Sequence, residues 1–196
     1  MTKDSVAQEV SRLLSLRDER VVFAESCTAG MCAATLGAIP GISKHLCGSA
    51  VTYVPKVKRN WLGVRRATIK RHTTESAEVA KEMAVGILNR TAAADWGVAV
   101  VGHIGPDAPE DKDGVIHVCC VRRTRKGRLK VKDQMVYTCK NTEPDTPSLQ
   151  RFRRQEEATV VVFTCLARQL HRKSKSDGKG DTLKLPGGKN GKVKQN

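Results

Sequence analysis

The sequence predicts an α/β fold, a three-layer α/β/α sandwich with a mixed sheet. Strand-like and helix-like segments alternate in the first half of the chain, which is typical of parallel strands joined by helices. Residues 96–101, WGVAVV, form a continuous apolar run, as a strand covered on both faces requires. Residues 115–121 and 129–137 read as two strands with no helix between them. This late pair predicts an antiparallel addition to the sheet.

The N-terminal segments predict helix, strand and helix in that order. Asp4 is a suitable N-cap for a first helix whose apolar side chains recur on one face, at Val6, Val10, Leu13 and Leu14. β-Branched and aromatic residues in 20–24 predict a buried strand. Alanine, methionine and leucine in 29–36 predict a helix directly after it. Residues 48–54 have the composition of a second strand, which Pro55 ends.

Two further helices are predicted from their start signals. Thr73 and Thr74 offer an N-cap for a helix that runs to about Arg90. Thr146 followed by proline marks the start of a long helix that ends near His171. We therefore expect one ordered domain over residues 1–171. Residues 172–196 are rich in Gly, Lys and Ser with few large apolar side chains, which predicts a basic disordered tail.

The formal net charge of +15 is concentrated in two stretches. Residues 172–196 hold eight Lys or Arg against two Asp, and residues 122–132, RRTRKGRLKVK, hold seven Lys or Arg. Charge runs are most often solvated surfaces, so a solvated hairpin and a solubilising tail explain both stretches. Weak nucleic-acid contact through the tail is the alternative, although aromatic residues are missing from both stretches.

Cysteine number and hydropathy argue against several other classes of protein. The seven cysteines are odd in number and include no CxxC pair, which argues against a disulfide framework and a zinc site. No apolar run approaches the roughly 18 residues of a membrane span. The N-terminus lacks the apolar core of a secretory signal. We expect a cytoplasmic protein with no membrane contact, no metal and no cofactor.

Chemistry-bearing side chains gather where the first strand meets the second helix. Glu25, Ser26, Cys27 and Thr28 are the first side chains after that strand that are free to face a cleft. Unpaired N–H groups at a helix N-terminus favour an anion or a developing oxyanion there. Residues 25–30, 53–58 and 102–107 each follow a predicted strand. Ligands collect at the carboxyl ends of such strands, so we expect these three segments to converge.

The sequence motifs around this turn resemble those of a known protein family. Its anchors are AESCTAG at 24–30, IPGISKHLCGSAVTY at 39–53, Lys58 followed by WLGV at 61–64, Met83-Ala84, and GHIGP at 102–106. In this order and spacing, from about Val6 to Leu170, the chain resembles the CinA C-terminal domain family. This competence/damage-inducible protein A group includes bacterial nicotinamide-nucleotide amidases.

The resemblance implies hydrolysis of the carboxamide of nicotinamide mononucleotide, giving nicotinic acid mononucleotide and ammonia without a metal. Ser26 would be the nucleophile. Lys58, if desolvated so that its neutral form is accessible, would be the base. Tyr53 would orient the lysine or the substrate. A nucleotide substrate and a homodimer are the partners that we expect.

The resemblance also implies binding roles. Amide groups around Thr28 and Gly30 would donate to an oxyanion or a phosphate. Gly102 and Gly105 would let the backbone approach a ligand closely. Arginines on the last helix would contact a phosphate.

Arg153 and its neighbour Arg154 match those helix-borne arginines.

Three positions depart from the family pattern. Ala29 replaces a glycine and adds a methyl group near the expected oxyanion site. Val101 replaces a hydroxyl-bearing residue that is expected near the substrate, and His103 replaces a smaller residue.

Other interpretations stay open for the same residues. Ser26 could simply cap a helix, Lys58 could be a surface lysine, and Tyr53 could be a core residue. A catalytically silent member that binds a nucleotide or a protein partner is the first alternative function. A nucleic-acid-binding module that uses residues 122–132 and the tail is the second.

Overall fold

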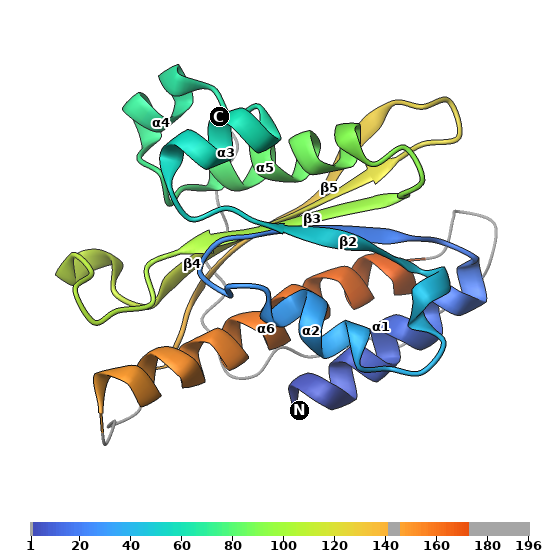
Figure 1. Ribbon diagram of the computed structural model, residues 1–196, viewed down its shortest axis with the longest axis horizontal. Helices are drawn as coiled ribbons and strands as arrows, with labels where there is room; N and C mark the ends of the chain where they lie inside the picture. The colour runs from blue at the N-terminus through green and yellow to red at the C-terminus, as the bar shows by residue number, and fades with distance from the viewer. Residues whose placement is uncertain (1, 141–145, 173–196) are drawn as a thin grey trace.

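A five-stranded mixed sheet lies between two layers of helices (Figure 1). The computed structural model describes residues 2–140 and 146–172. The strands are β1 (Val21–Glu25), β2 (Leu46–Val51), β3 (Trp96–Gly102), β4 (Val115–Arg123) and β5 (Leu129–Thr138). The helices are α1 (Lys3–Arg17), α2 (Met31–Gly37), α3 (Pro55–Leu62), α4 (Arg66–His72), α5 (Ala77–Arg90) and α6 (Pro147–His171), with short 3₁₀ turns η1 (Ile42–Lys44) and η2 (Glu110–Lys112).

The sheet order, β2-β1-β3-β4-β5, confirms the mixed α/β prediction. Strand β1 is parallel to both of its neighbours, and its last residue, Glu25, pairs with Val51 of β2 and Val100 of β3. Strands β4 and β5 join antiparallel to β3 and to one another. The carboxyl ends of β1, β2 and β3 therefore meet at one edge of the sheet.

Each face of the sheet has its own apolar core. Helices α1, α2 and α6 cover one face, and α5 with α3 and α4 covers the other (Figure 1). On the α6 face, Phe23 meets Phe163 edge to face with ring centroids 6.2 Å apart. Burying each such ring stabilises the fold by about 1.5–3 kcal/mol. Strand β1 is buried along its whole length because both layers pack on it.

Three helix starts differ from the sequence prediction. Thr2 is the N-cap of α1, since its side chain accepts from the Ser5 N–H, and Asp4 lies in the first turn. Ser76 caps α5, because Thr73 has a φ of 68° and cannot begin a helix. Pro55, which was expected only to end a strand, is the first residue of α3.

Helices α3 and α4 were not predicted, because residues 55–72 are dominated by Lys and Arg and show little apolar periodicity. The start of α6 was predicted correctly: Thr146 accepts from the Leu149 N–H. Over the described ranges, none of the helices is both long and apolar enough to cross a bilayer. The predicted tail, apart from Arg172, lies outside the described residues.

Gly86 provides a test of the packing between α3 and α5. A Cβ at Gly86 would overlap the Leu62 carbonyl, so Gly86→Ala should lower the free energy of unfolding by about 1–3 kcal/mol. Helix propensity alone predicts the opposite sign, a gain of about 1 kcal/mol. Urea denaturation measures the difference.

Gly37→Ala is the matched control, because a Cβ there would lie at an ordinary 3.8 Å from Leu46 Cδ2. That variant should be as stable as the unmodified protein or slightly more stable. Equal stability of the two variants would contradict the packing described here.

Candidate active site

A cavity of about 430 Å³ opens at the carboxyl ends of β1 and β3. Its volume lies within the range of small-molecule sites. The segments that follow β1, β2 and β3 all contribute to its wall, as the sequence predicted, together with α6. The lining residues are Ser26, Cys27, Tyr53, Glu75, Gly102, His103, Ile104, Gly105, Pro106, Asp107, Ala108 and Arg151.

The turn between β1 and α2 is built around the Glu25 carboxylate, which is fully buried. Its oxygens accept hydrogen bonds from the N–H groups of Gly30 and Cys32 at 3.0 Å and of Ala33 at 3.1 Å. The hydroxyl groups of Thr28 and Ser49 donate at 2.7 and 2.8 Å. A carboxylate at the positive end of a helix is stabilised there. Glu25 therefore occupies the helix N-terminus from inside the protein.

This contact changes the roles expected at the turn. Glu25 does not face the cleft, because it belongs to β1 and points beneath α2. Thr28 is buried, and neither it nor Gly30 is part of the cavity wall. The Thr28 hydroxyl and the Gly30 N–H already donate to Glu25 and are not free to bind an oxyanion. The sequence predicts an open helix N-terminus here, and this prediction is wrong because Glu25 occupies it.

Ser26 and Lys58 meet although 32 residues separate them. Lys58 Nζ lies 2.8 Å from Ser26 Oγ, and both side chains are buried, with Lys58 fully enclosed. The Ser26 backbone N–H donates to the Val100 carbonyl of β3 at 3.1 Å, which fixes the position of the serine. The interpretation of Lys58 as a surface lysine is wrong.

Lys58 is buried beside neutral acceptors. Its amine donates to the backbone carbonyls of Thr52 at 2.7 Å and Tyr53 at 2.9 Å, and its third contact is Ser26. Desolvation by burial lowers the pKa of Lys58 to about 8, and the negative charge of Glu75 opposes this only in part. The neutral amine is therefore accessible near neutral pH.

Tyr53 contacts the lysine through its backbone rather than its side chain. Its carbonyl accepts from Lys58, whereas its ring is 45% exposed at the cavity rim. The Tyr53 hydroxyl accepts a hydrogen bond from Arg151 Nη2 at 3.3 Å. The interpretation of Tyr53 as a core residue is therefore wrong, and its ring is free to contact a ligand.

Cys27 lies next to Ser26 in the same wall. Burial raises the pKa of the Cys27 thiol to about 12. Because the thiolate is the nucleophilic form of cysteine, Cys27 is a poor nucleophile in this setting. The Gln155 side chain donates to the Cys27 carbonyl at 3.0 Å and links this turn to α6.

Gly102, at the end of β3, and Gly105, in the loop that follows, are each required by the local structure. A Cβ at Gly102 would collide with the backbone of Val115 and Ile116 in the neighbouring strand β4. Gly105 has a φ of +67°, which favours glycine, and a Cβ there would lie 2.8 Å from Arg154 Nη1. Both residues nevertheless line the cavity.

The arginine that reaches the cavity is Arg151, not Arg153. Arg151 Nη1 donates to the Gly105 carbonyl at 2.6 Å. Arg153 is exposed and lies outside the cavity wall, because two residues further along a helix a side chain points about 200° away. Arg154 is buried and forms a bidentate pair with Asp113, which lowers the pKa of that carboxyl.

Glu75 is a further cavity residue that the sequence did not single out. It follows the predicted N-cap residues Thr73 and Thr74, but it precedes α5 and lies in the cavity wall. Its Oε2 is 3.6 Å from Nε2 of His103. Val101, by contrast, is buried in the core on the α5 face and does not reach the cavity. Across the two described ranges, His, Cys, Asp and Glu side chains form no cluster of three or more suited to a metal ion.

Known proteins are similar to this chain in sequence. A model of the CinA C-terminal domain matches residues 3–141. A CinA-like protein of Anaeromyxobacter sp. (strain K) is 36% identical over 150 residues, which cover 71% of this chain and 36% of the relative. A CinA-like protein of Thermosynechococcus vestitus is 39% identical over 104 residues, or 53% of this chain and 25% of the relative. The match thus spans only about a quarter to a third of these relatives.

Solved structures share the fold over most of the chain. Competence damage-inducible protein A of Klebsiella pneumoniae subsp. pneumoniae MGH 78578 superposes with a TM-score of 0.74 at 28% identity, covering 88% of this chain and 99% of that one. The competence/damage inducible protein CihA of Agrobacterium tumefaciens gives a TM-score of 0.70 at 26% identity, covering 85% and 94%.

Ala29 replaces a glycine of the family pattern, and we predict that it lowers the stability of the fold without affecting the cavity. It has a φ of 55°, is exposed and does not line the cavity. A left-handed conformation costs a residue with a Cβ about 1–2 kcal/mol, so Ala29→Gly should raise the free energy of unfolding by about 1 kcal/mol. Urea denaturation measures it.

Ala34→Gly is the matched control, because Ala34 is exposed in the regular part of α2. It should lower the free energy of unfolding by about 1 kcal/mol. The same sign for both substitutions would contradict the strain assigned to Ala29.

Proposed function

The chain belongs to the CinA C-terminal domain family, and from this membership and its cleft we propose that it is a nicotinamide-nucleotide amidase. It would hydrolyse the carboxamide of nicotinamide mononucleotide to nicotinic acid mononucleotide and ammonia. The observation that carries the proposal is the buried contact of 2.8 Å between Lys58 Nζ and Ser26 Oγ. A hydroxyl and an amine with a lowered pKa form a nucleophile and base pair for acyl transfer.

The hydrogen-bond acceptors around Lys58 orient the N–H bonds and the lone pair of its amine. Two carbonyls, of Thr52 and Tyr53, accept two N–H bonds of the amine. In the neutral form, the lone pair then occupies the remaining tetrahedral position, which faces Ser26 Oγ. Lys58 can thus accept the hydroxyl proton as the oxygen attacks.

The reaction would proceed in two halves. Ser26 Oγ attacks the carboxamide carbon while its proton passes to Lys58, and a tetrahedral intermediate forms. Lys58 returns that proton to the amide nitrogen, the C–N bond breaks, and ammonia leaves an ester on Ser26. Water then attacks the ester with Lys58 again as base, which releases the carboxylic acid and restores the serine hydroxyl.

The rest of the cleft suits a nucleotide. The Arg151 guanidinium at the rim is a candidate partner for the phosphate, because arginine binds phosphate oxygens in a bidentate manner. The exposed Tyr53 ring beside it offers a flat surface for the pyridine ring or the ribose. In this proposal, Arg151 replaces Arg153 as the phosphate contact.

Substitution of the pair tests the mechanism directly. Ser26→Ala and Lys58→Ala should each lower ammonia release from nicotinamide mononucleotide by more than about 1,000-fold, because each removes one half of the acyl-transfer pair. Lys56→Ala is the matched control: Lys56 lies on the same helix but is exposed, so activity should stay within about twofold.

Two results would contradict the proposal in different ways. Full activity of Ser26→Ala would remove the serine from the mechanism. Tight nucleotide binding by the unmodified protein without ammonia release would favour a catalytically silent member.

The pH dependence follows from the lowered pKa of Lys58, about 8. Below that pH the amine is charged and cannot accept a proton, so kcat/KM should rise about tenfold per pH unit and level off above pH 8. A rate profile from acid to alkaline pH measures this. A flat profile across neutral and mildly alkaline pH would show that Lys58 is not the base.

A further inference from the structure

A second and larger hollow, of about 960 Å³, lies at the opposite edge of the sheet from Ser26. Asp18 and Glu19 precede β1, and Asp95 precedes β3, so this hollow sits at the amino ends of the strands whose carboxyl ends form the cleft. The hairpin between β4 and β5 forms its other wall. We call it the basic groove.

The lining of the basic groove is unlike that of a small-molecule site. All twelve lining residues are polar or charged, and they comprise eight Lys or Arg, three acidic residues and one threonine. Small-molecule pockets are mostly apolar with a few polar groups. A surface with an excess of positive charge and no apolar or aromatic lining residue suits phosphates better than it suits bases.

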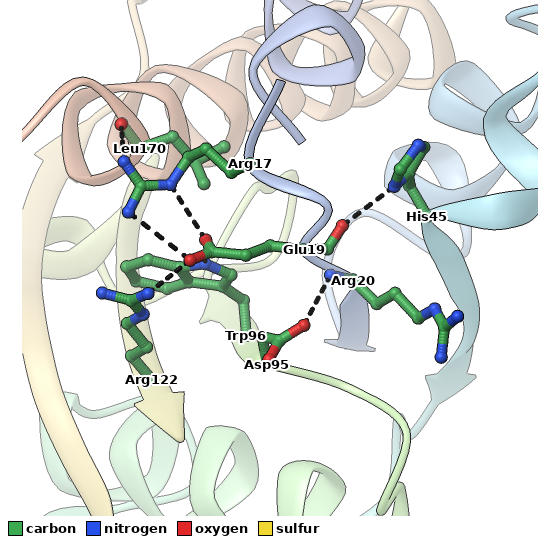
Figure 2. A network of polar contacts seen from close by, with 8 residues as sticks. All are labelled: Arg17, Glu19, Arg20, His45, Asp95, Trp96, Arg122 and Leu170. Atoms are coloured by element: carbon green, nitrogen blue, oxygen red, sulfur yellow. Dashed lines mark hydrogen bonds and ion pairs between the residues drawn. The ribbon is translucent and has the colours of Figure 1, made fainter. Parts of the chain in front are cut away.

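The floor of the basic groove is a fixed ion-pair network. Figure 2 shows Glu19 between the guanidinium groups of Arg17 and Arg122, above the buried indole of Trp96. Glu19 accepts from Trp96 Nε1 at 2.7 Å and from Arg17 Nε at 3.1 Å, and Arg17 also donates to the Leu170 carbonyl at 2.9 Å. The Arg122 guanidinium lies over the Trp96 ring at 5.4 Å. These contacts hold two of the eight cations in place.

The rim, by contrast, carries cations without counter-charges. Its side chains are exposed, and within residues 2–140 and 146–172 none of them forms an ion pair with a carboxylate. They are Arg125, Lys126, Arg128, Lys130 and Lys132. Like charges this close repel one another, and bound anions would relieve that repulsion.

We propose that the basic groove binds the sugar-phosphate backbone of a nucleic-acid strand without reading its sequence. Lys and Arg contacts to phosphates supply most of the affinity in such binding and carry no base information. A site for a free nucleotide would have a mostly apolar wall, and the lining of this groove has no apolar residue. Because the groove and the Ser26 cleft lie at opposite edges of the sheet, the two sites should not compete.

The test compares two triple variants of the full chain that change the net charge equally. One is Arg125→Gln/Lys126→Gln/Arg128→Gln at the rim, and the other is Arg66→Gln/Lys70→Gln/Lys81→Gln on α4 and α5, where the replaced side chains are also exposed. Fluorescence anisotropy follows binding to labelled single strands of mixed sequence, one RNA and one DNA, from about 50 to 200 mM salt. Thermal unfolding checks that both variants are folded.

We expect the rim variant to bind at least about tenfold more weakly near physiological salt, and its log–log salt slope to fall by about 2. The α4–α5 variant should change by less than about threefold. A preference for RNA or for DNA would support the proposal and identify the strand. Equal losses in both variants, no loss in the rim variant, or no binding by the unmodified protein would overturn it.

Discussion

The Glu25 carboxylate, buried under the N-terminus of α2, is the interaction on which the site depends. It receives three backbone N–H groups of the turn and α2 together with the hydroxyls of Thr28 and Ser49, so a single side chain ties β1, α2 and β2 together. An unpaired buried carboxylate would be very costly, and here every contact stabilises the charge. Because Ser26 follows Glu25 directly, the rigid turn sets where its hydroxyl points.

Lys58 differs from Glu25, because its contacts offset only part of the cost of burying a charged amine. Burial away from water lowers the pKa of its amine, and its hydrogen-bond acceptors are two carbonyls and a hydroxyl rather than a carboxylate. The same site thus contains a buried carboxylate that accepts five hydrogen bonds and a buried amine whose three acceptors are all neutral. The carboxylate gives the site its shape, and in the proposed reaction the amine accepts the proton of Ser26.

The fold and the meeting of three loops were predictable from local patterns. Buried apolar runs such as residues 96–101 and the late strand pair predicted the mixed sheet, and the quoted anchors led to Ser26 and Lys58. The role of Glu25 was not predictable, because a sequence does not show that a strand's last carboxylate folds back under the next helix. Nor could the run RFRR at 151–154 reveal which arginine faces the cleft, since that depends on the rotation of α6 against the sheet.

Within the part of the chain that the structure describes, Lys58 has no carboxylate partner, and this bears on which molecules suit the cleft. Among the residues that the structure describes, its hydrogen-bond acceptors are a hydroxyl and two carbonyls, and Glu75 acts on it only as a neighbouring charge. A ligand that placed an anionic group next to this amine would keep the amine protonated, and a protonated amine cannot act as a base. In the proposed reaction, the cleft would therefore favour elongated ligands that carry their negative charge at one end and present a neutral amide at the other.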